Sequence, residues 1–310
     1  MEGHGPATCA AYVDAGFSWS REPFEEGQYT DDTQLARELL ESWVSSRRFH
    51  PEDYAARVAA LFRDQRVVGR GRATANAAHR LDIGVPWRHA GEPAPSAGNG
   101  SAMRSAPVGL MCAGDIDQLI QVACDQSRMT HSDPRCLAGA TAIAAATRLA
   151  VLEPELRGAA ALTAIAEAVQ AVHEGFAEHL RWLIELLPRT PGEAAREVAA
   201  LGRAAGDLDD GWRGISPFVV PSVLWALYAA HTEPADPSAP YMSAVTVAVR
   251  AGGDVDTTAA MAGAIAGARV GARGLPPRAR SVHDRRRWGY SELEVLATRA
   301  WELSSQGQLT

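Results

Sequence analysis

The chain has 310 residues, of which 46% are hydrophobic and 22% are charged, a balance typical of globular proteins. Its formal net charge of −7 excludes a general nucleic-acid-binding protein or a protein that binds anionic membranes, because both need a basic face. The sequence contains no lysine, so all 30 basic residues are arginines and mechanisms that use a catalytic lysine are excluded.

The sequence shows no sign of export or of a membrane span. No stretch approaches the roughly 18–20 apolar residues that a spanning helix needs. The N-terminus lacks the basic and apolar regions of a secretory signal. The four cysteines are too scattered for a disulfide scaffold or a zinc knuckle, which favours buried thiols in a reducing compartment. We therefore expect a cytoplasmic protein. The absence of lysine and the abundant alanine indicate a GC-rich genome, and we expect a bacterial source.

Helical periodicity dominates the chain. Leu35, Leu39, Leu40 and Trp43 recur at intervals of three and four residues, which predicts a helix from about Thr33. Similar apolar faces predict helices around residues 53–64, 114–127, 134–151, 159–186, 193–204, 219–230 and 256–270. Residues 245–249 fit either a strand or the buried end of a helix.

Loops rich in glycine, proline and aspartate separate these segments. They lie at residues 89–100, 190–192, 206–217, 231–240 and 274–277. None is long or polar enough for an interdomain linker, and no internal repeat is visible. The sequence therefore predicts one all-α domain over residues 1–310.

Two acidic segments lie far apart in the chain. In the first, Thr30, Asp31, Asp32 and Thr33 precede an apolar helical face. A helix start explains one carboxylate and one hydroxyl, because such residues cap helices, but it does not require two adjacent aspartates between two threonines.

The second acidic segment, residues 252–258, joins two glycines to Asp254, Asp256 and Thr257. Carboxylates two residues apart on an extended turn point the same way, and the glycines let the backbone approach an ion closely. The alternative is again a helix start, at Asp256 or Thr257. Hard oxygen ligands suit magnesium, manganese or calcium, and the two segments together could supply a two-ion site.

Two further segments are weaker signals. Residues 96–103 contain Gly98-Asn99-Gly100, which indicates a turn first and a nest of backbone N–H groups for phosphate second. His131 precedes a helix that Ser132 or Asp133 can cap, with Pro134 as its first residue. Anions are favoured at such a helix start, although a lone histidine is more often structural.

In this order, the four segments resemble the ADP-ribosylglycohydrolase family. The matching stretches are residues 27–34, 98–104, 130–131 and 252–263. The resemblance implies an all-α orthogonal bundle and two divalent cations, Mg²⁺ or Mn²⁺. By matching position, it implies the metal ligands Thr30, Asp31, Asp32, Asp254, Asp256 and Thr257. It also implies that ADP-ribose is held, chiefly by its diphosphate and distal ribose, by Gly98, Asn99, Gly100, Ser101, Met103 and His131.

The implied reaction is hydrolysis of the bond between C1 of the distal ribose and an amino-acid side chain or another leaving group. The cations would orient the ribose hydroxyls and lower the pKa of a bound water. We expect a monomeric enzyme that acts on an ADP-ribosylated protein or a small ADP-ribose conjugate. Which linkage is cut lies outside the matching segments.

The chain departs from the family at its N-terminus. Members usually carry a further N-terminal helix followed by a glutamate that acts near the ions, and this sequence starts too late to contain that helix. Glu2 either takes the place of that catalytic glutamate or is a frayed, solvated end. A relative that binds ADP-ribose with impaired catalysis is therefore the alternative function. Residues 254–258 also match the Asp-x-Asp-x-Thr signature of haloacid-dehalogenase-like phosphatases, but their late position and the lack of lysine argue against that class.

Overall fold

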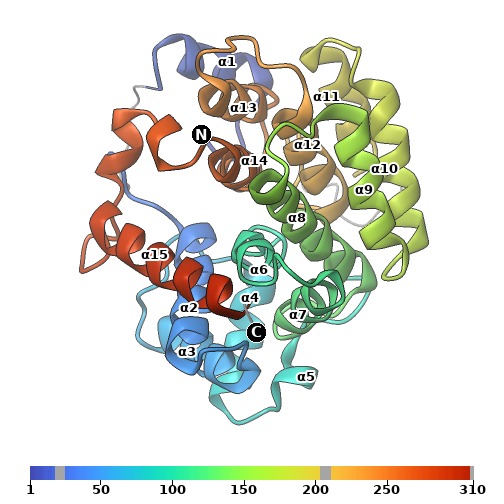
Figure 1. Ribbon diagram of the computed structural model, residues 1–310. Coiled ribbons are helices and arrows are strands. Elements are labelled where there is room, and N and C mark those ends of the chain that lie inside the picture. The colour runs from blue at the N-terminus through green and yellow to red at the C-terminus, as the bar shows by residue number, and fades with distance from the viewer. Residues whose placement is uncertain (18–24, 203–210, 308–310) are drawn as a thin grey trace.

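The computed structural model describes residues 1–17, 25–202 and 211–307. Throughout these residues the regular structure is helical, and the pairings outside the helices are isolated bridges rather than strands. The predicted all-α class is therefore confirmed. The helices of Figure 1 are α1 (Pro6–Asp14), α2 (Asp31–Ser46), α3 (Pro51–Arg63), α4 (Arg72–Asp82), α5 (Trp87–Ala90), α6 (Ala106–Met111), α7 (Ile116–Arg128), α8 (Pro134–Leu152), α9 (Gly158–Gln170), α10 (Glu174–Leu186), α11 (Pro191–Ala200), α12 (Val219–His231), α13 (Pro240–Arg250), α14 (Val255–Val270) and α15 (Tyr290–Gly307), with 3₁₀ turns η1 (Ala272–Gly274) and η2 (Pro277–Ser281).

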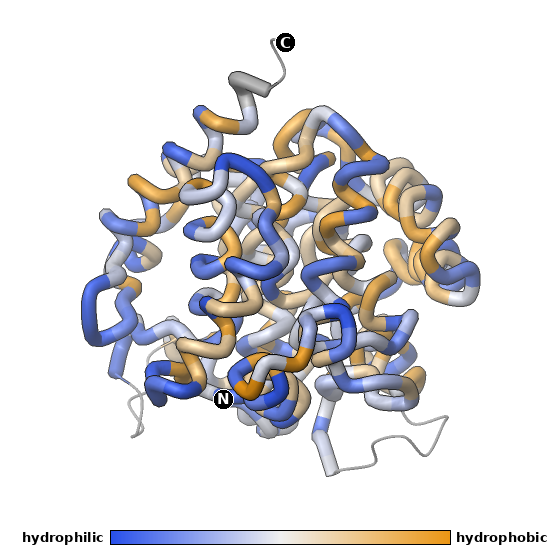
Figure 2. Tube along the Cα trace, turned by 90° about the horizontal axis from the view of Figure 1, so that it is seen from below, coloured by the Kyte–Doolittle hydropathy of each residue, from blue (hydrophilic) through white to orange (hydrophobic). Residues whose placement is uncertain are grey.

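Helix α8 forms the centre of the core. It packs against α6, α7, α9, α12 and α14. Small residues allow these close approaches: a Cβ atom on Gly139 of α8 would lie 2.5 Å from Cγ2 of Val219 in α12. On α6, a Cβ atom on Gly109 would lie 2.2 Å from the Ala144 carbonyl oxygen of α8. A helix enclosed in this way is apolar on all sides, whereas most others have one buried face and alternate in hydropathy, as Figure 2 shows.

One feature of α8 differs from the sequence analysis. By length and composition, this helix matches a membrane span, with a mean hydropathy of 1.4. This resemblance was not predicted, because the apolar character of the helix comes mostly from alanine rather than from large side chains. Of its most apolar window, 78% is buried inside the structure, so packing in the core accounts for this composition.

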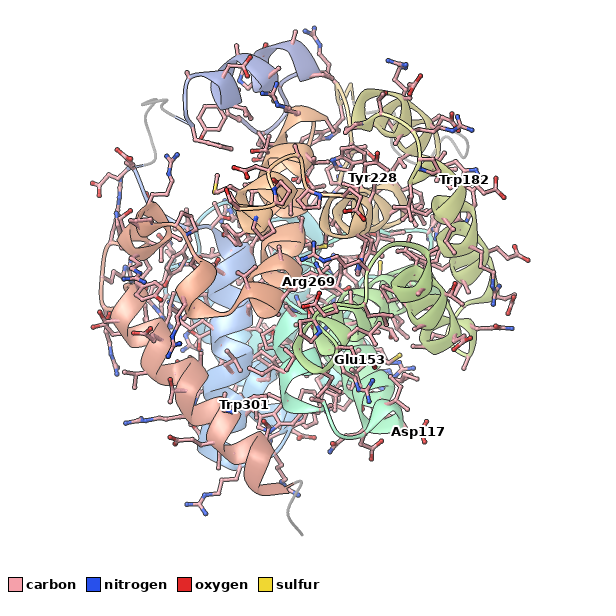
Figure 3. All side chains as sticks on the ribbon, turned by 45° about the horizontal axis from the view of Figure 1, so that its top comes forward. Asp117, Glu153, Trp182, Tyr228, Arg269 and Trp301 are labelled. Atoms are coloured by element: carbon pink, nitrogen blue, oxygen red, sulfur yellow. The ribbon has the colours of Figure 1, made fainter. Side chains whose placement is uncertain are left out.

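Helices α12, α13 and α14 pack together beside α8 and carry the second acidic segment to the centre. The Trp225 indole Nε1 of α12 donates to the Ala248 carbonyl oxygen of α13 at 3.0 Å. The Arg269 guanidinium joins the end of α14 to α12 by donating to the Ala230 carbonyl oxygen at 2.9 Å (Figure 3). The second bond ties α14 directly to α12, and α14 also contacts α2.

Several predicted elements need correction. The helical stretch at residues 159–186 is two helices, α9 and α10, because His173 starts a new helix by accepting a hydrogen bond from the Phe176 backbone N–H. Residues 245–249 lie inside helix α13 and form no strand. Helices α1, α4, α5, α6 and α15 were not predicted, and the first two residues of the predicted loop at 89–100 belong to α5. Part of the predicted loop at residues 206–217 lies outside the described residues.

Candidate active site and metal centre

The two acidic segments meet where α2 and α14 begin. Asp31 and Asp32 lie in the first turn of α2. Helix α14 begins directly after Asp254 and carries Asp256 in its first turn. Asp32 interacts electrostatically with Asp256 and accepts a hydrogen bond from the Thr257 hydroxyl. The two acidic segments, which lie more than 200 residues apart in the chain, therefore share one centre, as a two-ion site would require.

Helix capping does not explain these side chains. Neither Thr30 nor Asp254 makes a side-chain cap bond, although each is the residue before its helix. The Thr30 hydroxyl instead donates to Asp32 Oδ2 at 2.6 Å. Asp254 Oδ2 accepts from the Asn99 side-chain amide, also at 2.6 Å. The polar groups turn toward one another, as expected of a binding centre.

The carboxylates of this centre fit a divalent cation. Glu2, Asp254 and Asp256 each offer one oxygen, and these oxygens lie within 4.8 Å of one another. Among the described residues, Oδ1 of Asp32 and Oδ1 of Asp256 are buried without a hydrogen-bond partner. Buried carboxylate oxygens that lack partners are destabilising unless a proton or a cation neutralises them. The donor set of hard oxygens suits Mg²⁺ or Mn²⁺.

Raised pKa values show that the negative charges of these aspartates are unfavourable without a cation or a proton. Burial, followed by the neighbouring Asp32 carboxylate, raises the pKa of Asp31 to about 8. Burial and Asp256 raise the pKa of Asp32 to about 7. Burial and Asp256 also hold the pKa of Asp254 well above its usual range. A cation at this centre would remove the mutual repulsion that contributes to these shifts.

The N-terminal segment brings Glu2 to this centre. The Gly3 N–H donates to the Gly253 carbonyl oxygen at 2.9 Å, and the Gly253 N–H donates to the His4 carbonyl oxygen at 2.8 Å. Glu2 is therefore held beside the aspartates and is not a frayed end. Burial and Asp256 raise the pKa of its carboxyl group.

Gly252 and Gly253, in the second acidic segment, allow the N-terminal segment to come this close. Gly252 and Gly253 have φ values of 70° and 86°, which side chains rarely adopt. A Cβ atom on Gly252 would lie 2.7 Å from the Pro6 nitrogen, and one on Gly253 would lie 2.1 Å from the Ile215 carbonyl oxygen. These glycines are predicted to let the backbone approach an ion. The structure shows that they let it approach other backbone segments closely.

The Gly98-Asn99-Gly100 loop forms one wall of the site. Gly98, Gly100 and Met103 line the cleft described below. The Asn99 amide also donates to Ser222 Oγ at 2.8 Å, so its side chain fixes Asp254. Ser101 is fully buried, and its hydroxyl donates to a carbonyl oxygen of α8 at 3.4 Å. Of the predicted ADP-ribose-binding residues, Ser101 is the one that does not line the cleft.

His131 lies against this wall. A Cβ atom on Gly100 would lie 2.7 Å from the His131 Cε1 atom, so glycine is required there by the imidazole. The ring is 2% exposed and lines the cleft. Burial and the nearby Arg104 guanidinium lower its pKa to about 3. His131 is therefore a neutral side chain at physiological pH.

A cleft of 1020 Å³ lies over the centre and is large enough for a nucleotide-sized ligand. Its lining includes Glu2, Asp31, Asp254, Asp256 and Thr257, together with the wall formed by Gly98–Gly100 and His131. Arg70, Arg72 and Trp212 also line it and were not predicted. The Gly69-Arg70-Gly71 stretch is a loop signal that could have drawn attention to the first two.

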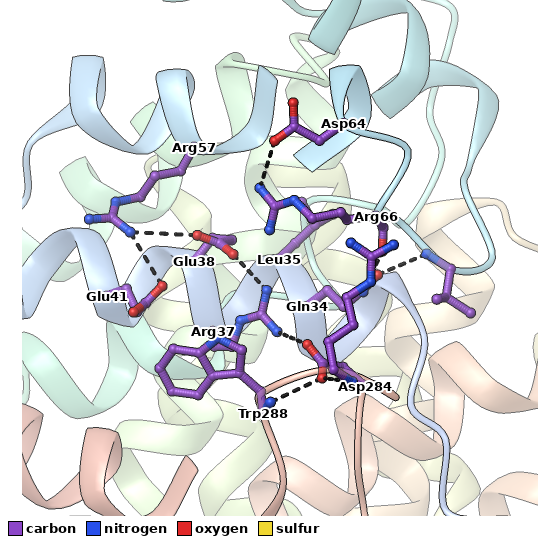
Figure 4. Close-up of polar contacts among 12 residues, drawn as sticks. Gln34, Leu35, Arg37, Glu38, Glu41, Arg57, Asp64, Arg66, Asp284 and Trp288 are labelled. Carbon is purple, nitrogen blue, oxygen red and sulfur yellow. Dashed lines mark hydrogen bonds and ion pairs between the residues drawn. The ribbon is translucent and has the colours of Figure 1, made fainter. Parts of the chain in front are cut away.

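Buried polar residues of α2 support the cleft from behind (Figure 4). The Gln34 amide donates to the Arg66 carbonyl oxygen and accepts from the Val68 N–H, both at 2.9 Å. These bonds hold the loop that carries Arg70 and Arg72 over Asp31. One helix thus contributes aspartates to the centre and positions a wall of the cleft.

The same helix is tied to the segment before α15. The Arg37 guanidinium pairs with Glu38 at 2.6 Å and with Asp284 at 3.0 Å. It also donates to the Tyr29 hydroxyl, which donates to the Trp288 carbonyl oxygen. This network fixes the residues directly before Thr30.

The helical bundle, the acidic centre and the cleft can be compared with known proteins. A model of the ADP-ribosylglycohydrolase family matches residues 4–309. The chain belongs to the ADP-ribosylglycohydrolase family. The family predicted from its motifs is therefore confirmed, and with it the class of enzyme, an ADP-ribosyl hydrolase that cleaves a glycosidic bond.

Relatives of this ADP-ribosylglycohydrolase include two hydrolases. The chain is 27% identical to human ADP-ribosylhydrolase ARH3 over 296 residues, which cover 87% of the chain and 77% of that protein. It is 28% identical over 262 residues to ADP-ribosylarginine hydrolase Tri1 of Pseudomonas putida, covering 81% of the chain and 61% of that protein. A solved structure named as an ADP-ribosylglycohydrolase-related protein complex superposes with a TM-score of 0.62 at 26% identity, covering 97% of this chain and 96% of that one. The predicted bundle type is confirmed.

Proposed function

We propose that this ADP-ribosylglycohydrolase is a divalent-metal-dependent enzyme that releases ADP-ribose from an ADP-ribosylated side chain or a small ADP-ribose conjugate. The observation that carries the proposal is the pair of buried carboxylate oxygens without partners, on Asp32 and Asp256, below a cleft that suits a nucleotide. These atoms need a cation or a proton. The family supports the substrate class.

The residues divide into metal ligands and groups that position them. Thr30, Asp31, Asp32, Asp254, Asp256 and Thr257 would hold two cations, Mg²⁺ or Mn²⁺. When bound, the cations would orient the ribose hydroxyls and lower the pKa of a water molecule. The Thr30 hydroxyl and the Asn99 amide orient Asp32 and Asp254. Gly98, Gly100, Met103 and His131 would contact ADP-ribose.

Glu2 is the proposed acid–base group. A general acid or base must reach the reacting atoms directly or through one water. Glu2 lies among the aspartates and on the cleft, which meets that requirement. Its raised pKa brings the carboxyl group closer to neutral pH, where such a group can both take and give a proton.

The test is hydrolysis of a panel of ADP-ribose conjugates linked through arginine, serine or an acyl ester, with and without Mg²⁺ or Mn²⁺. We expect release of ADP-ribose from at least one conjugate and its loss on chelation. Asp254→Asn should abolish turnover, whereas Asp117→Asn, on the exposed side of α7, should match the parent. Binding of ADP-ribose by the parent without turnover of any conjugate would instead support the catalytically impaired relative.

We also propose a monomeric, cytoplasmic enzyme whose partner is the ADP-ribosylated protein or conjugate itself. The four cysteines are free and buried, which supports a reducing compartment. Light scattering behind a sizing column would test the monomer. Cell fractionation would test the location.

A further inference from the structure

Arg104 is a fully buried cation behind the cleft wall. Its Nε donates to Gln126 Oε1 at 2.8 Å, and its Nη2 donates to the Gln126 carbonyl oxygen at 2.7 Å and to Thr130 Oγ1 at 2.8 Å. Its Nη1 donates to the Gly100 carbonyl oxygen at 3.2 Å, and the guanidinium is also hydrogen-bonded to the Tyr54 side chain. Among the described residues every one of these acceptors is neutral. The guanidinium is therefore well bonded, but in the described structure it forms no ion pair, and the Asp31 carboxylate acts on its charge only through space.

The Thr130 hydroxyl connects Arg104 to His131, and its hydrogen bonds determine which nitrogen of the imidazole carries the proton. Thr130 Oγ1 lies 2.8 Å from His131 Nδ1 and already accepts a hydrogen bond from Arg104, which can only donate. The hydroxyl proton needs an acceptor, and in the described structure Nδ1 is the available one. If Nδ1 carried the ring proton instead, the proton of a fully buried hydroxyl would have no acceptor. The hydrogen bonds thus place the ring proton of His131 on Nε2.

The Nε2 side of the ring faces the cleft wall. It lies near Gly98 and Gly100, where a Cβ atom would come within 3.5 Å and 3.2 Å of Nε2. No described residue accepts a hydrogen bond from this nitrogen, and the ring lines the cleft. A donor that is held in place and lacks a partner is available to a ligand.

We propose that Arg104 acts through Thr130 to hold His131 as a neutral imidazole with its proton on Nε2, and that this N–H donates to an oxygen of ADP-ribose. Arg104 and Thr130 are positioning residues, and His131 is the residue that contacts the ligand. The protonation state of His131 follows from the free protein alone. The identity of the ligand rests on the proposed function.

The charges around His131 favour the neutral ring. Among the described residues, Arg104 is the charged group that acts on the ring. The nearby carboxylates belong to Glu92, whose backbone bridges to that of His131, and to Asp133, two residues further along the chain. Both carboxylates are already paired, Glu92 with Arg80 at 2.9 Å and Asp133 with Arg135 at 2.8 Å. The remaining cation, Arg104, repels an imidazolium. The low pKa of the ring agrees with this arrangement and keeps the donor unchanged between pH 5 and pH 8.

Nitrogen-15 NMR of histidine-labelled protein tests the protonation state directly. The chain has nine histidines, and His131→Gln identifies the signals of His131 by their loss. We expect the pattern of a neutral ring protonated at Nε2, constant from pH 5 to pH 8. A ring protonated at Nδ1, or a titration in that range, would overturn the proposal.

Substitutions at Thr130 test the connection to the ligand. Thr130→Val keeps the shape and removes the hydroxyl, so we expect His131 to populate both tautomers and ADP-ribose to bind about tenfold more weakly with Mg²⁺ present. Thr130→Ser restores the hydroxyl and should bind within about twofold of the parent. Thr147→Val, a buried threonine of α8 whose hydroxyl bonds only within its helix, is the matched control and should leave both measurements unchanged.

The outcomes separate the two proposals. If Thr130→Val binds ADP-ribose as tightly as the parent while circular dichroism shows an intact fold, the link from Thr130 to the ligand is wrong. If the parent shows the expected tautomer but binds no ADP-ribose, the proposed function and the ligand are wrong. The assignment of the proton to Nε2 would then still stand.

Discussion

Glu2 reaches the acidic centre because the backbone of Gly3 and His4, which follow it, is hydrogen-bonded to that of Gly253. A positioned acid–base group typically contributes about 10²–10⁴ in rate. We therefore expect Glu2→Gln to lower kcat by about that factor and to leave the Kd for ADP-ribose nearly unchanged. Steady-state kinetics and calorimetry would measure both quantities.

The control for Glu2 is Glu178→Gln, an exposed glutamate on α10, which should behave as the parent. Equal rates for Glu2→Gln and the parent would remove Glu2 from the reaction. A parallel loss of Mg²⁺ affinity would make Glu2 a metal ligand instead, a role that its distance to Asp254 and Asp256 also allows.

Asn99, which is predicted to bind ADP-ribose and lines the cleft, also orients a predicted metal ligand. Its amide holds Asp254 Oδ2 at 2.6 Å. Asn99→Ala would release this carboxylate, and the Mg²⁺ concentration for half-maximal rate should rise about tenfold, as for other groups that orient metal ligands. Titration of activity with Mg²⁺ tests this. An unchanged Mg²⁺ requirement with a higher KM would return Asn99 to the ligand-binding residues.

At this scale the sequence was informative where chemistry and local spacing coincide. The aspartates were found because each cluster exceeds what a helix start needs. Arg104 was not assigned a role, although it lies in a matched motif, because its acceptors Gln126 and Thr130 come from α7 and its surroundings. Only the fold brings a buried cation and a histidine together.

The junction of α2 and α14 makes metal binding and protonation compete. Burial and Asp32 raise the folded-state pKa of Asp31 above the value of an unfolded chain. The metal-free protein therefore binds the proton more tightly when folded, and this stabilisation is lost as pH rises through about 8. In chelator, the melting temperature should fall from pH 6 to pH 9.

Two comparisons check this linkage. Asp31→Asn removes the titrating group, so its melting temperature should fall less over the same range. Excess Mg²⁺ should raise the melting temperature of the parent most at high pH, where protons no longer compete. A parent whose metal-free melting temperature falls no more than that of Asp31→Asn between pH 6 and pH 9 would contradict the assigned shift.

An ion pair and two hydrogen bonds of Asp284 connect α2 to the segment before α15. Asp284 pairs with Arg37 and accepts from the backbone N–H groups of Arg286 and Trp288. Asp284→Ala removes these bonds from a buried site and should lower the free energy of unfolding by about 3 kcal/mol. Urea denaturation measures this, with the exposed Asp236→Ala as control. A loss no larger than that of the control would show that the network is dispensable.

Element boundaries show why periodicity alone was insufficient. The apolar face of residues 159–186 continues across the break between α9 and α10, because both helices bury their faces in the same core. The break depends on the N-cap formed by His173, and histidine is not among the residues that commonly cap a helix start. By contrast, Pro134 and Asp133 marked the start of α8 correctly, since proline at the first position and an aspartate cap are strong local signals.

At the scale of the molecule, the site is a property of the whole fold. Its residues come from the N-terminal segment, the starts of α2 and α14, the loops before α4 and α6, and the end of α7. None of these pieces forms the cleft alone. The order of the motifs along the chain predicted that they would converge, but the position of the N-terminal segment could only be seen once Gly253 was found to pair with it.

The pairing of residues 3 and 4 with Gly253 has a practical consequence for making the protein. Any affinity tag placed before Met1 must leave the molecule beside Glu2, at the mouth of the cleft. A short N-terminal tag should therefore raise KM or lower kcat, and removing it with a protease should restore both. The same tag placed after Thr310 should leave the kinetics unchanged, so the choice of expression vector could decide whether activity is observed at all.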